Sequence, residues 1–542
     1  MIPKNILTQQ QIVLLYLSFA IVYISGLFIP LMENDSAQHA SMAMRMTLSN
    51  NFLELYKGDA PYLDKPHLHF WLSAFFMKIF GINDFTYRIP AFLSIILAAY
   101  STKKLAYLLY KNENLSYLAS LIFLSSQTII LSAHDVRTDA VLTGFIIFSI
   151  WQLVYFIKTH KISAAVLSGF GTAMAFSSKG MMALAIIGLC IISYLAFSGE
   201  WKRAFHKRIF LLILFFAVGV LPIFYAYYYQ FGNEGISFIL FNQSYNRLTA
   251  NGFGETNSDY FFFFHTLLWV FLPFSLLFYT GIIDKTVLSF RTLFCRNITP
   301  EFLTIGGFWV TIFLFSYSKF KLPHYLNGLI AIISIFVAYY IFDLISKRKI
   351  KTMKVLYTIQ VVVIFSSIIG IGLLTYFFTR IPHPLMFVLV LAVIGILLFY
   401  IFKKDNLFRK FILVSFLFTI FVNIYLNTQF YPILTQYQGS LKLAEFVKKH
   451  HINPERVVVP KNYGIWNFDF YTHHNTPRIE IDQVKAGDYL IICQEDVKNI
   501  HKKYTLIKRE NNYRITKLSL KFLNPETRQK QLENYYIVKI EQ

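Results

Sequence analysis

Long apolar runs limit what this chain can fold into. A helix needs roughly 17–25 apolar residues to cross the hydrocarbon core of a bilayer, where every backbone N–H and C=O must be bonded within the protein. About thirteen runs meet or approach that length. They cover residues 11–32, 89–107, 115–133, 140–157, 164–177, 181–197, 209–229, 261–283, 302–318, 324–345, 355–378, 384–402 and 411–426. We therefore expect a mainly α-helical membrane protein, in which residues 1–428 form a transmembrane bundle of about thirteen helices.

The charge balance agrees with a membrane protein and excludes a nucleic-acid partner. Only 15% of the 542 residues are charged and 56% are hydrophobic, which is too apolar for an ordinary soluble protein of this length. The formal net charge is +22. The Lys and Arg residues of the chain form short clusters between apolar runs, where the positive-inside rule puts them. Membrane topology therefore accounts for the excess of positive charge.

The same clusters predict the orientation of the bundle. They fall in alternate loops, at 103–111, 158–161, 202–208, 285–296, 347–354 and 403–410, which we assign to the cytoplasm. Residues 11–32 are followed by Glu33 and Asp35 without a small-residue cleavage site, so we expect this run to remain as the first span. With an odd number of spans, the amino terminus lies inside and the tail lies outside.

The tail loses the membrane character. Residues 429–542 alternate helix-like and strand-like segments, at 440–450, 456–459, 489–493, 504–509 and 535–540. We expect a small soluble α/β domain on the outer side.

The first outside loop, residues 33–88, is long for a connection between spans. It contains two amphipathic stretches, 37–49 and 67–80; Pro66 can open the second and Gly81 can close it. We expect both to form helices along the membrane surface. Periodicity alone leaves open whether they only cover the bundle.

Charged side chains gather at the outer ends of the predicted spans. Ionisable groups at this depth are costly, and they are usually paired or functional. A lipid-borne phosphate would explain the cations among them, since Lys and Arg neutralise it and stabilise it as a leaving group. The alternative is that each charge is a snorkelling or salt-bridged structural residue. The residues are Asp35, Lys65, Asp135, Arg137, Asp139, Lys179, Arg247, Lys319, Lys321 and His324.

At these positions the chain resembles a known family. The segment Tyr62-Leu-Asp-Lys-Pro-His-Leu-His-Phe-Trp-Leu72 resembles a signature of bacterial transferases related to protein O-mannosyltransferases and to the aminoarabinose transferase of lipid A. Further similar motifs are Arg137-Thr-Asp-Ala-Val-Leu142, Ser178-Lys-Gly180, 242–247 and Ser318-Lys-Phe-Lys-Leu-Pro-His-Tyr-Leu326. These proteins are GT-C glycosyltransferases, so the resemblance implies a GT-C bundle for the membrane region.

The resemblance also implies a reaction and roles for individual residues. An acceptor hydroxyl would attack the anomeric carbon of a polyprenyl-phosphate sugar with inversion, with Asp35 as general base and Asp139 as a second acid. Lys65, Arg247 and Lys321 would bind the donor phosphate. Substrate-binding or supporting roles would fall to Asp64, His69, Arg137, Lys179, Lys319, His324 and Tyr325. The partners would be the lipid-linked donor, membrane lipid and an acceptor that is lipid A, another glycolipid or a protein Ser/Thr, at a bacterial inner membrane.

Departures from the family pattern leave the acceptor open. The family usually follows its Asp with a second acid and an Arg, where this chain has Ser36 and Ala37. Asp64 replaces Glu, and His67 replaces Pro, beside Lys65. The sugar and the acceptor are therefore not assigned.

We expect no cofactor and assign no metal site, although a divalent metal is left open. The spacing of His67, His69, His265 and His324 fits no zinc pattern. No nucleotide is needed, because the carrier lipid brings the activated sugar.

Two other functions compete with this interpretation. A glycan polymerase or ligase would also use a lipid-linked donor, but its large outer loop is expected late in the bundle. A lipid or glycan transporter would place its polar residues near the middle of the spans, whereas here they crowd one face.

Overall fold

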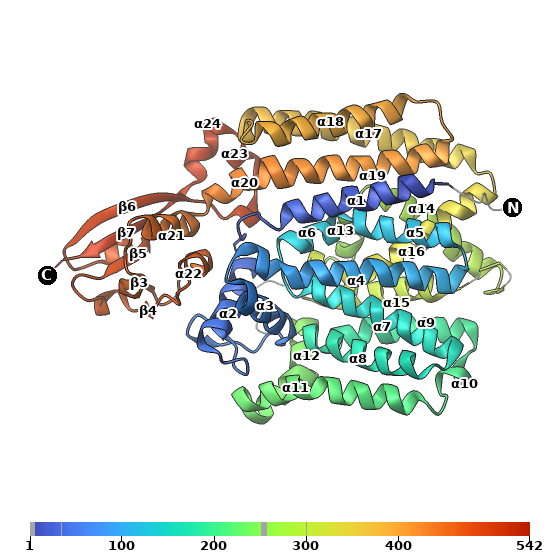
Figure 1. Cartoon of the computed structure of the whole chain (residues 1–542), viewed down its shortest axis with the longest axis horizontal. Coiled ribbons are helices and arrows are strands. Elements are labelled where there is room, and N and C mark those ends of the chain that lie inside the picture. The colour runs from blue at the N-terminus through green and yellow to red at the C-terminus, as the bar shows by residue number, and fades with distance from the viewer. Residues whose placement is uncertain (1–5, 34, 251–256, 297, 300, 542) are drawn as a thin grey trace.

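The computed structural model describes residues 6–33, 35–250, 257–296, 298–299 and 301–541. Most of them form a bundle of roughly parallel and antiparallel helices with a small sheet domain at one end (Figure 1). The bundle contains α1 (Gln9–Gly26), α4 (Asp84–Tyr110), α5 (Glu113–Ser125), α6 (Gln127–His134), α7 (Asp139–Thr159), α8 (Ile162–Lys179), α9 (Met181–Ser198), α10 (Trp201–Ala204), α11 (Ile209–Ser237), α12 (Gln243–Thr249), α13 (Phe262–Val270), α14 (Ser275–Arg291), α15 (Leu303–Tyr317), α16 (Asn327–Ser346), α17 (Ile350–Leu374), α18 (Pro384–Phe402) and α19 (Leu407–Tyr425).

Every one of the predicted apolar runs forms helix, but fewer of them are long and apolar enough to cross a membrane alone. Among the described residues nine helices meet that test, or ten if the bent pair α5 and α6 is one span. The other predicted runs differ for local reasons. Helix α8 is rich in Ser, Gly and Ala, Pro273 lies at the break between α13 and α14, and α15 has only 15 residues.

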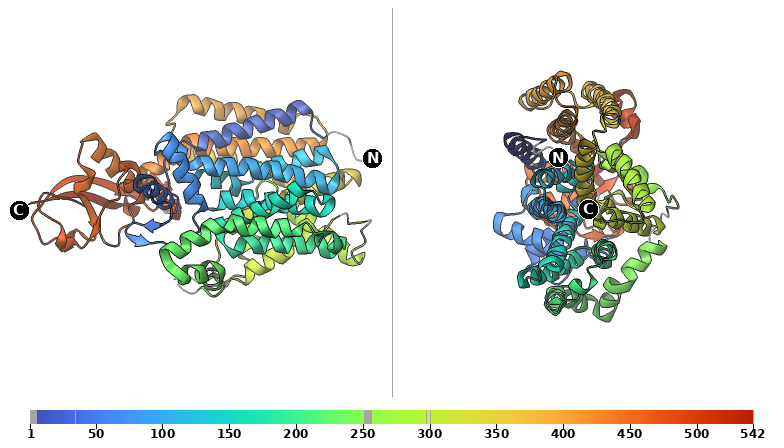
Figure 2. Two further views of the ribbon diagram at one scale, coloured as in Figure 1. Left: turned by 60° about the horizontal axis from the view of Figure 1, so that its bottom comes forward. Right: turned by 90° about the vertical axis from the view of Figure 1, so that its right-hand side faces the viewer.

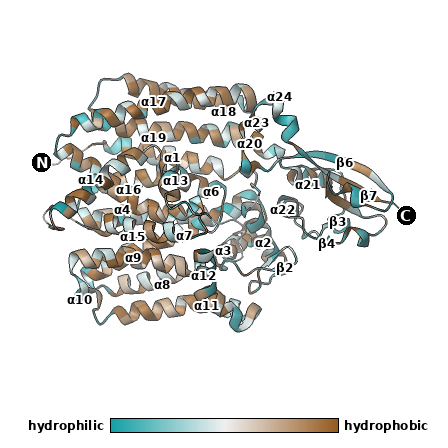
Figure 3. Cartoon of the chain, turned by 180° about the vertical axis from the view of Figure 1, so that it is seen from behind, coloured by the Kyte–Doolittle hydropathy of each residue, from teal (hydrophilic) through white to brown (hydrophobic). Residues whose placement is uncertain are grey.

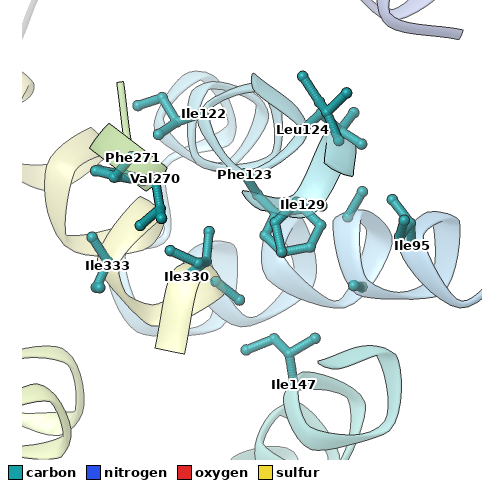
Figure 4. Packing of buried hydrophobic residues seen from close by; sticks show 14 of the residues in the cluster. Ile95, Ile122, Phe123, Leu124, Ile129, Ile147, Val270, Phe271, Ile330 and Ile333 are labelled. Atoms are coloured by element: carbon teal, nitrogen blue, oxygen red, sulfur yellow. The ribbon is translucent and has the colours of Figure 1, made fainter. Parts of the chain in front are cut away.

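The core of the bundle consists of aliphatic and aromatic side chains from helices that are distant in sequence. Figure 4 shows Ile95 of α4, Ile129 of α6, Ile147 of α7 and Ile330 of α16 around Phe123 of α5. Because lipid offers no hydrophobic driving force between helices, close packing of such side chains holds the bundle together.

The Lys- and Arg-rich loops all lie at one end. They join α4 to α5, α7 to α8, α9 to α11, α14 to α15, α16 to α17 and α18 to α19, at the end of the bundle away from the sheet domain (Figure 1). Between the two ends the helices are mostly hydrophobic (Figure 3). The sheet domain therefore lies at the end that the charge pattern assigns to the outside. We call this the outer end.

The first long loop forms the two predicted helices at the outer end. They are α2 (Asp35–Ser49) and α3 (Leu68–Phe80), joined by the short hairpin of β1 (Tyr56–Lys57) and β2 (Ala60–Pro61). Gly81 ends α3 with a φ of 84°, a value that suits glycine. Both helices lie between the bundle and the sheet domain (Figure 1).

The carboxyl-terminal part forms the expected α/β domain. Its sheet has the strand order β4-β3-β5-β7-β6, with β3 parallel to β4 and β5 and the other pairs antiparallel. The strands are β3 (Val457–Pro460), β4 (Arg478–Ile479), β5 (Tyr489–Cys493), β6 (Tyr504–Asn512) and β7 (Glu533–Ile540). Helices α21 (Gly439–Lys449) and α22 (Trp466–Thr472) pack together, and α22 faces α2 (Figure 2). The predicted helix and four strands are thus confirmed.

Glu33 lies where this domain meets the first loop. Its carboxylate accepts a hydrogen bond from Ser440 Oγ at 2.6 Å. Burial raises the pKa of Glu33 from 4.5 to about 7; the bond from Ser440 acts in the opposite direction, and the nearby Asp469 raises the pKa further. The folded protein therefore favours the protonated form of Glu33.

This pKa predicts a pH-dependent stability. The contribution of neutral Glu33 is complete below its ordinary pKa of 4.5 and is lost as the pH rises through about 7. Glu33→Gln stays neutral, so we expect it to raise the melting temperature of the detergent-solubilised protein at pH 8 and to change it little at pH 4.5. The control is Glu455→Gln, at an exposed glutamate of the same domain. Equal effects of Glu33→Gln at both pH values would contradict the assignment.

Candidate active site

Asp35 opens α2 at the outer end of the bundle. Its side chain is 44% exposed, and its Oδ2 lies 3.1 Å from Nη1 of Arg137. The other terminal nitrogen of Arg137 lies 3.0 Å from Asp135 Oδ2. Burial opposes the charge of Arg137, but Asp135 and Asp35 together raise its pKa above the ordinary value. Asp35 is thus a carboxylate at a helix amino terminus, oriented by a permanent cation and open to solvent.

A second, buried pair lies next to Arg137. Asp139, the first residue of α7, accepts a bond from Nζ of Lys179 at 2.6 Å, and both side chains are almost fully buried. His324 lies between the two groups: its Nδ1 is 3.5 Å from Arg137 Nη1 and its Nε2 is 3.8 Å from Asp139 Oδ2. The Lys179 ammonium also faces the ring of Tyr325 at 4.6 Å.

A third cluster brings two cations onto one carboxylate. Asp64 lies 2.7 Å from Nζ of Lys65 through Oδ2 and 3.1 Å from Nη2 of Arg247 through Oδ1. Helices α11 and α12 fix the backbone beneath this cluster. Tyr227 donates to the carbonyl of Leu63 at 3.0 Å, and Gln243 donates to the carbonyl of Asp64 at 2.6 Å.

The charges of this cluster shift each other's titration. Burial opposes ionisation of Asp64, but Lys65 and Arg247 lower its pKa below the ordinary range. Burial and then the charge of Arg247 lower the pKa of Lys65 to about 8, although Asp64 partly offsets them. Lys65 is therefore a cation at neutral pH that loses its proton under mildly alkaline conditions.

The three clusters lie close enough to interact. Burial raises the pKa of Tyr62, and the charges of Asp64 and then Asp35 raise it further, so this phenol lies near both carboxylates. Lys179 is within electrostatic reach of Arg247 and Asp64. The arrangement is one site with a solvent-exposed acid on one side and a pair of convergent cations on the other.

An apolar cleft of about 510 Å³ leads to Arg247. It is formed by α9, α12, α15 and the turn before α16, with Arg247 and Tyr325 in its lining. Apolar lining residues include Met181, Leu184, Leu189, Leu248 and Phe315. A long hydrocarbon chain fits this lining, with its polar end at Arg247.

Three predicted residues lie outside these clusters. Nζ of Lys321 donates to the carbonyl of Asn257 at 2.8 Å and faces the Tyr260 ring at 5.5 Å. Lys319 is exposed, and its backbone pairs with Leu248. His69 is fully buried, with Nε2 3.4 Å from the hydroxyl of Tyr87. The remaining predicted residues are all members of the three clusters.

Some residues near the site were not singled out from the sequence. His39 lies one turn after Asp35 on α2, buried against the rings of His69 and Phe70. Tyr227 and Gln243 fix the Asp64 loop. A spacing of four from Asp35 could have indicated His39, and Gln243 falls within the motif 242–247, but Tyr227 sits in an apolar run without a local signal.

The histidines considered as possible metal ligands lie in separate environments. His67 Nε2 lies 3.2 Å from the carbonyl of Leu53, and His265 lies 3.7 Å from Asp259 at the surface. Within the described ranges, no three His, Cys, Asp or Glu side chains gather in a way that could hold a metal ion.

Comparison with known proteins identifies the family resemblance. Residues 64–226 match the family model described as dolichyl-phosphate-mannose-protein mannosyltransferase. The chain is 24% identical to undecaprenyl phosphate-alpha-4-amino-4-deoxy-L-arabinose arabinosyl transferase 2 of Proteus mirabilis over 66% of its own length and 64% of the relative. It is 27% identical to the corresponding transferase of Yersinia enterocolitica, over 63% of this chain and 61% of that one. The aligned part therefore spans less than two thirds of these relatives. The resemblance inferred from the motifs is confirmed.

Comparison of structures extends the similarity to the whole fold. The crystal structure of ArnT from Cupriavidus metallidurans bound to undecaprenyl phosphate matches with a TM-score of 0.74 over 98% of both chains, at 16% sequence identity. The apo form of the same protein matches with a TM-score of 0.73. The bundle and the carboxyl-terminal domain thus share the ArnT fold.

The buried pair of Asp139 and Lys179 allows a test of its structural contribution. Lys179→Met would leave Asp139 buried without the ammonium that donates to it at 2.6 Å, so we expect a loss of roughly 3–5 kcal/mol in stability. Adding Asp139→Asn should recover most of the loss, as measured by thermal unfolding in detergent. The matched control is Lys442→Met, which removes the exposed pair with Glu445 and should cost less than about 1 kcal/mol. If Lys179→Met is as mild as the control, the pair does not stabilise the fold.

Proposed function

We propose that this chain is an integral membrane glycosyltransferase. It moves a sugar from a polyprenyl-phosphate carrier to an acceptor on the outer face of the membrane, with inversion at the anomeric carbon. The observation that carries the proposal is the convergence of Lys65 and Arg247 on Asp64, with Arg247 also in the lining of the apolar cleft. A polyprenyl phosphate has the matching chemistry, a long hydrocarbon chain that ends in an anion.

The proposed reaction needs one base and a stabilised leaving group. The acceptor hydroxyl attacks the anomeric carbon, and Asp35 takes its proton. The bond between that carbon and the phosphate oxygen breaks, and its electron pair leaves with the polyprenyl phosphate. Lys65 and Arg247 stabilise the charge that develops on this phosphate. Arg137 orients Asp35, and Asp139, Lys179, His324 and Tyr325 support the site from the bundle.

The two parts of the chain lie in different places in this proposal, one in the membrane and one outside it. Residues 1–428 form the catalytic membrane domain, and residues 429–542 form a domain outside the cytoplasm. The bacterial relatives support an inner membrane as the location, and the charge pattern supports an amino terminus in the cytoplasm. The named relatives are arabinosyl transferases of undecaprenyl phosphate-alpha-4-amino-4-deoxy-L-arabinose, so a donor of this class is the first to test. Lipid A, another glycolipid and protein Ser/Thr are the candidate acceptors.

The roles of Asp35 and Lys65 predict the loss of transfer. We expect Asp35→Asn and Lys65→Ala each to lower the rate by about 100-fold or more, the range for a general base or a charge-stabilising group. The assay offers undecaprenyl-phosphate sugars to purified protein with a membrane extract as acceptor, and mass spectrometry detects the glycosylated product. Asp59→Asn changes an exposed acid of the same loop and should leave the rate unchanged.

Two results would oppose this assignment. Substantial transfer by the Asp35→Asn variant would show that Asp35 is not the general base. Movement of the carrier lipid across vesicles without cleavage of the sugar bond would favour a transporter instead of an enzyme.

The pKa of Lys65 predicts how donor binding depends on pH. Its ammonium is present below about 8, and above that pH a proton must be regained before the phosphate is bound, so affinity falls up to about tenfold per pH unit. We expect undecaprenyl phosphate binding to weaken between pH 8 and 9.5 in the wild type and to stay level in Lys65→Arg, whose guanidinium remains charged. Parallel pH profiles for the two proteins would refute a role for Lys65 ionisation.

A further inference from the structure

The loop that carries Asp35 and Lys65 is fixed from two different parts of the chain. Its Lys65 end is bonded to the bundle, through Tyr227 and Gln243. The middle of the loop is also bonded to α11, where the side-chain amide of Gln230 pairs with both backbone groups of Leu55 at 3.0 Å. These contacts position the cations that bind the donor phosphate in the proposed function.

At the Asp35 end, Arg88 of the bundle bonds to the carbonyls of Leu27 and Ile29, and the carboxyl-terminal domain bonds to the residues that follow, up to α2. Gln438, directly before α21, is buried. Its side-chain amide bonds to one backbone N–H and one backbone carbonyl, as the backbone of a neighbouring β-strand would. Its Oε1 accepts from the backbone N–H of Glu33 at 2.7 Å, and its Nε2 donates to the carbonyl of Leu31 at 2.9 Å. One side chain thus fixes two backbone groups directly upstream of α2.

Two further side chains of the domain complete this contact. The hydroxyl of Tyr471, on α22, accepts from the N–H of Leu31 at 2.8 Å and donates to Asp84 at 2.6 Å. Ser440 donates to the carboxylate of Glu33. Asp84 is the first residue of α4, so the contact ties the domain to the loop and to the bundle at once. We call Gln438, Ser440 and Tyr471 the clamp.

The domain contacts the loop a second time at the β1–β2 hairpin. A Cβ added at Gly58 would lie 2.9 Å from Nε of Arg478, so the hairpin backbone lies directly against that side chain. Lys57 lies over the ring of Trp466 at 5.7 Å, and Arg478 covers the same ring at 4.7 Å. The domain therefore packs on the loop on both sides of α2.

We propose that the carboxyl-terminal domain is a positioning element that sets the place of Asp35 relative to the bound donor. The inference rests on the proposed function of Asp35 as base and goes beyond it by assigning a task to the domain. The side chain of Asp35 is oriented by Arg137, and the clamp fixes the backbone that precedes α2. Because the phosphate cations are fixed by α11 and α12, the two halves of the site depend on different supports.

This separation predicts different effects on turnover and on donor binding. Loss of the clamp moves Asp35, and a displacement near 1 Å can cost about 100-fold in rate. It leaves Lys65 and Arg247 in place. We therefore expect Gln438→Leu to lower kcat by about 10- to 100-fold and to change undecaprenyl phosphate binding by less than about twofold. Gln243→Leu, which cuts the bond to the Asp64 carbonyl, should weaken that binding.

The experiment uses the full-length protein and three measurements. Hydrogen exchange reports the backbone amides of Leu31 and Glu33, which the clamp protects. Transfer from an undecaprenyl-phosphate sugar at saturating donor gives kcat, and binding of undecaprenyl phosphate gives the donor affinity. Gln483→Leu, at an exposed glutamine of the same domain, is the matched control. Tyr471→Phe keeps the ring and removes only the hydroxyl, and it replaces Gln438→Leu if that variant fails to fold.

Each outcome decides a different claim. Faster exchange at Leu31 and Glu33, with a lower kcat and unchanged donor binding, supports the positioning role. Faster exchange with an unchanged kcat overturns it, and so does an equal loss of donor binding. If the wild type transfers no sugar from any donor tested, the proposed function fails. Hydrogen exchange then decides alone whether the domain fixes the loop, and unchanged protection in Gln438→Leu and Tyr471→Phe refutes the clamp.

Discussion

The buried guanidinium of Arg88 fixes the outer ends of α1 and α6. It donates to the carbonyls of Leu27 and Ile29, where α1 ends, and to the carbonyl of His134, where α6 ends. Helix ends leave carbonyls without intrahelical partners, and at the margin of a membrane water supplies few substitutes. Arg88, on α4, has five N–H donors and therefore supplies hydrogen bonds to carbonyls at both helix ends at once. The chain then continues from α1 to Asp35 and from α6 to Arg137. The proposed base and the cation that orients it therefore start from one common support.

The bundle could be predicted because the apolar runs that form its helices are continuous in the sequence. Apolar length indicated the helical runs of the bundle, although fewer of them can cross a membrane alone, and the basic clusters indicated the loops that gather at the end away from the sheet domain (Figure 1). Prediction was less accurate where a single residue interrupts the pattern. The first helix ends at Gly26, before the end of its apolar run at 32, and the chain packs so closely there that a side chain at position 26 would collide with the ring of His134. Hydropathy averages over such positions, since the collision involves a residue more than a hundred positions away.

Most of the residues that cluster at the outer end could be predicted from the sequence, but their pairings could not. Charges at span ends are visible in the sequence, and ten of them were identified. Which acid meets which base depends on how helices pack: Lys179 meets Asp139 across 40 positions, and Arg247 meets Asp64 across 183. Lys321 shows the limit of the approach. Like the paired cations, it lies at the outer end of a predicted span. Its ammonium, however, bonds to the backbone carbonyl of Asn257, and the charge pattern of the sequence did not indicate that contact.

The arrangement of charges explains how the site can exist before a donor binds. Four cations of the described clusters, Lys65, Arg137, Lys179 and Arg247, each lie within 3.1 Å of one of the carboxylates of Asp35, Asp64, Asp135 and Asp139. Lys65 and Arg247 would repel each other in a partly buried place, and Asp64 offsets this repulsion by bonding to both. The two cations are therefore already gathered when a phosphate arrives. The phosphate has to compete with one carboxylate, but it need not assemble its own binding site, so less of its interaction energy is spent on ordering long side chains. Asp35 differs from the other three carboxylates because it is the most exposed, which makes it the one that an acceptor from the solvent side can reach.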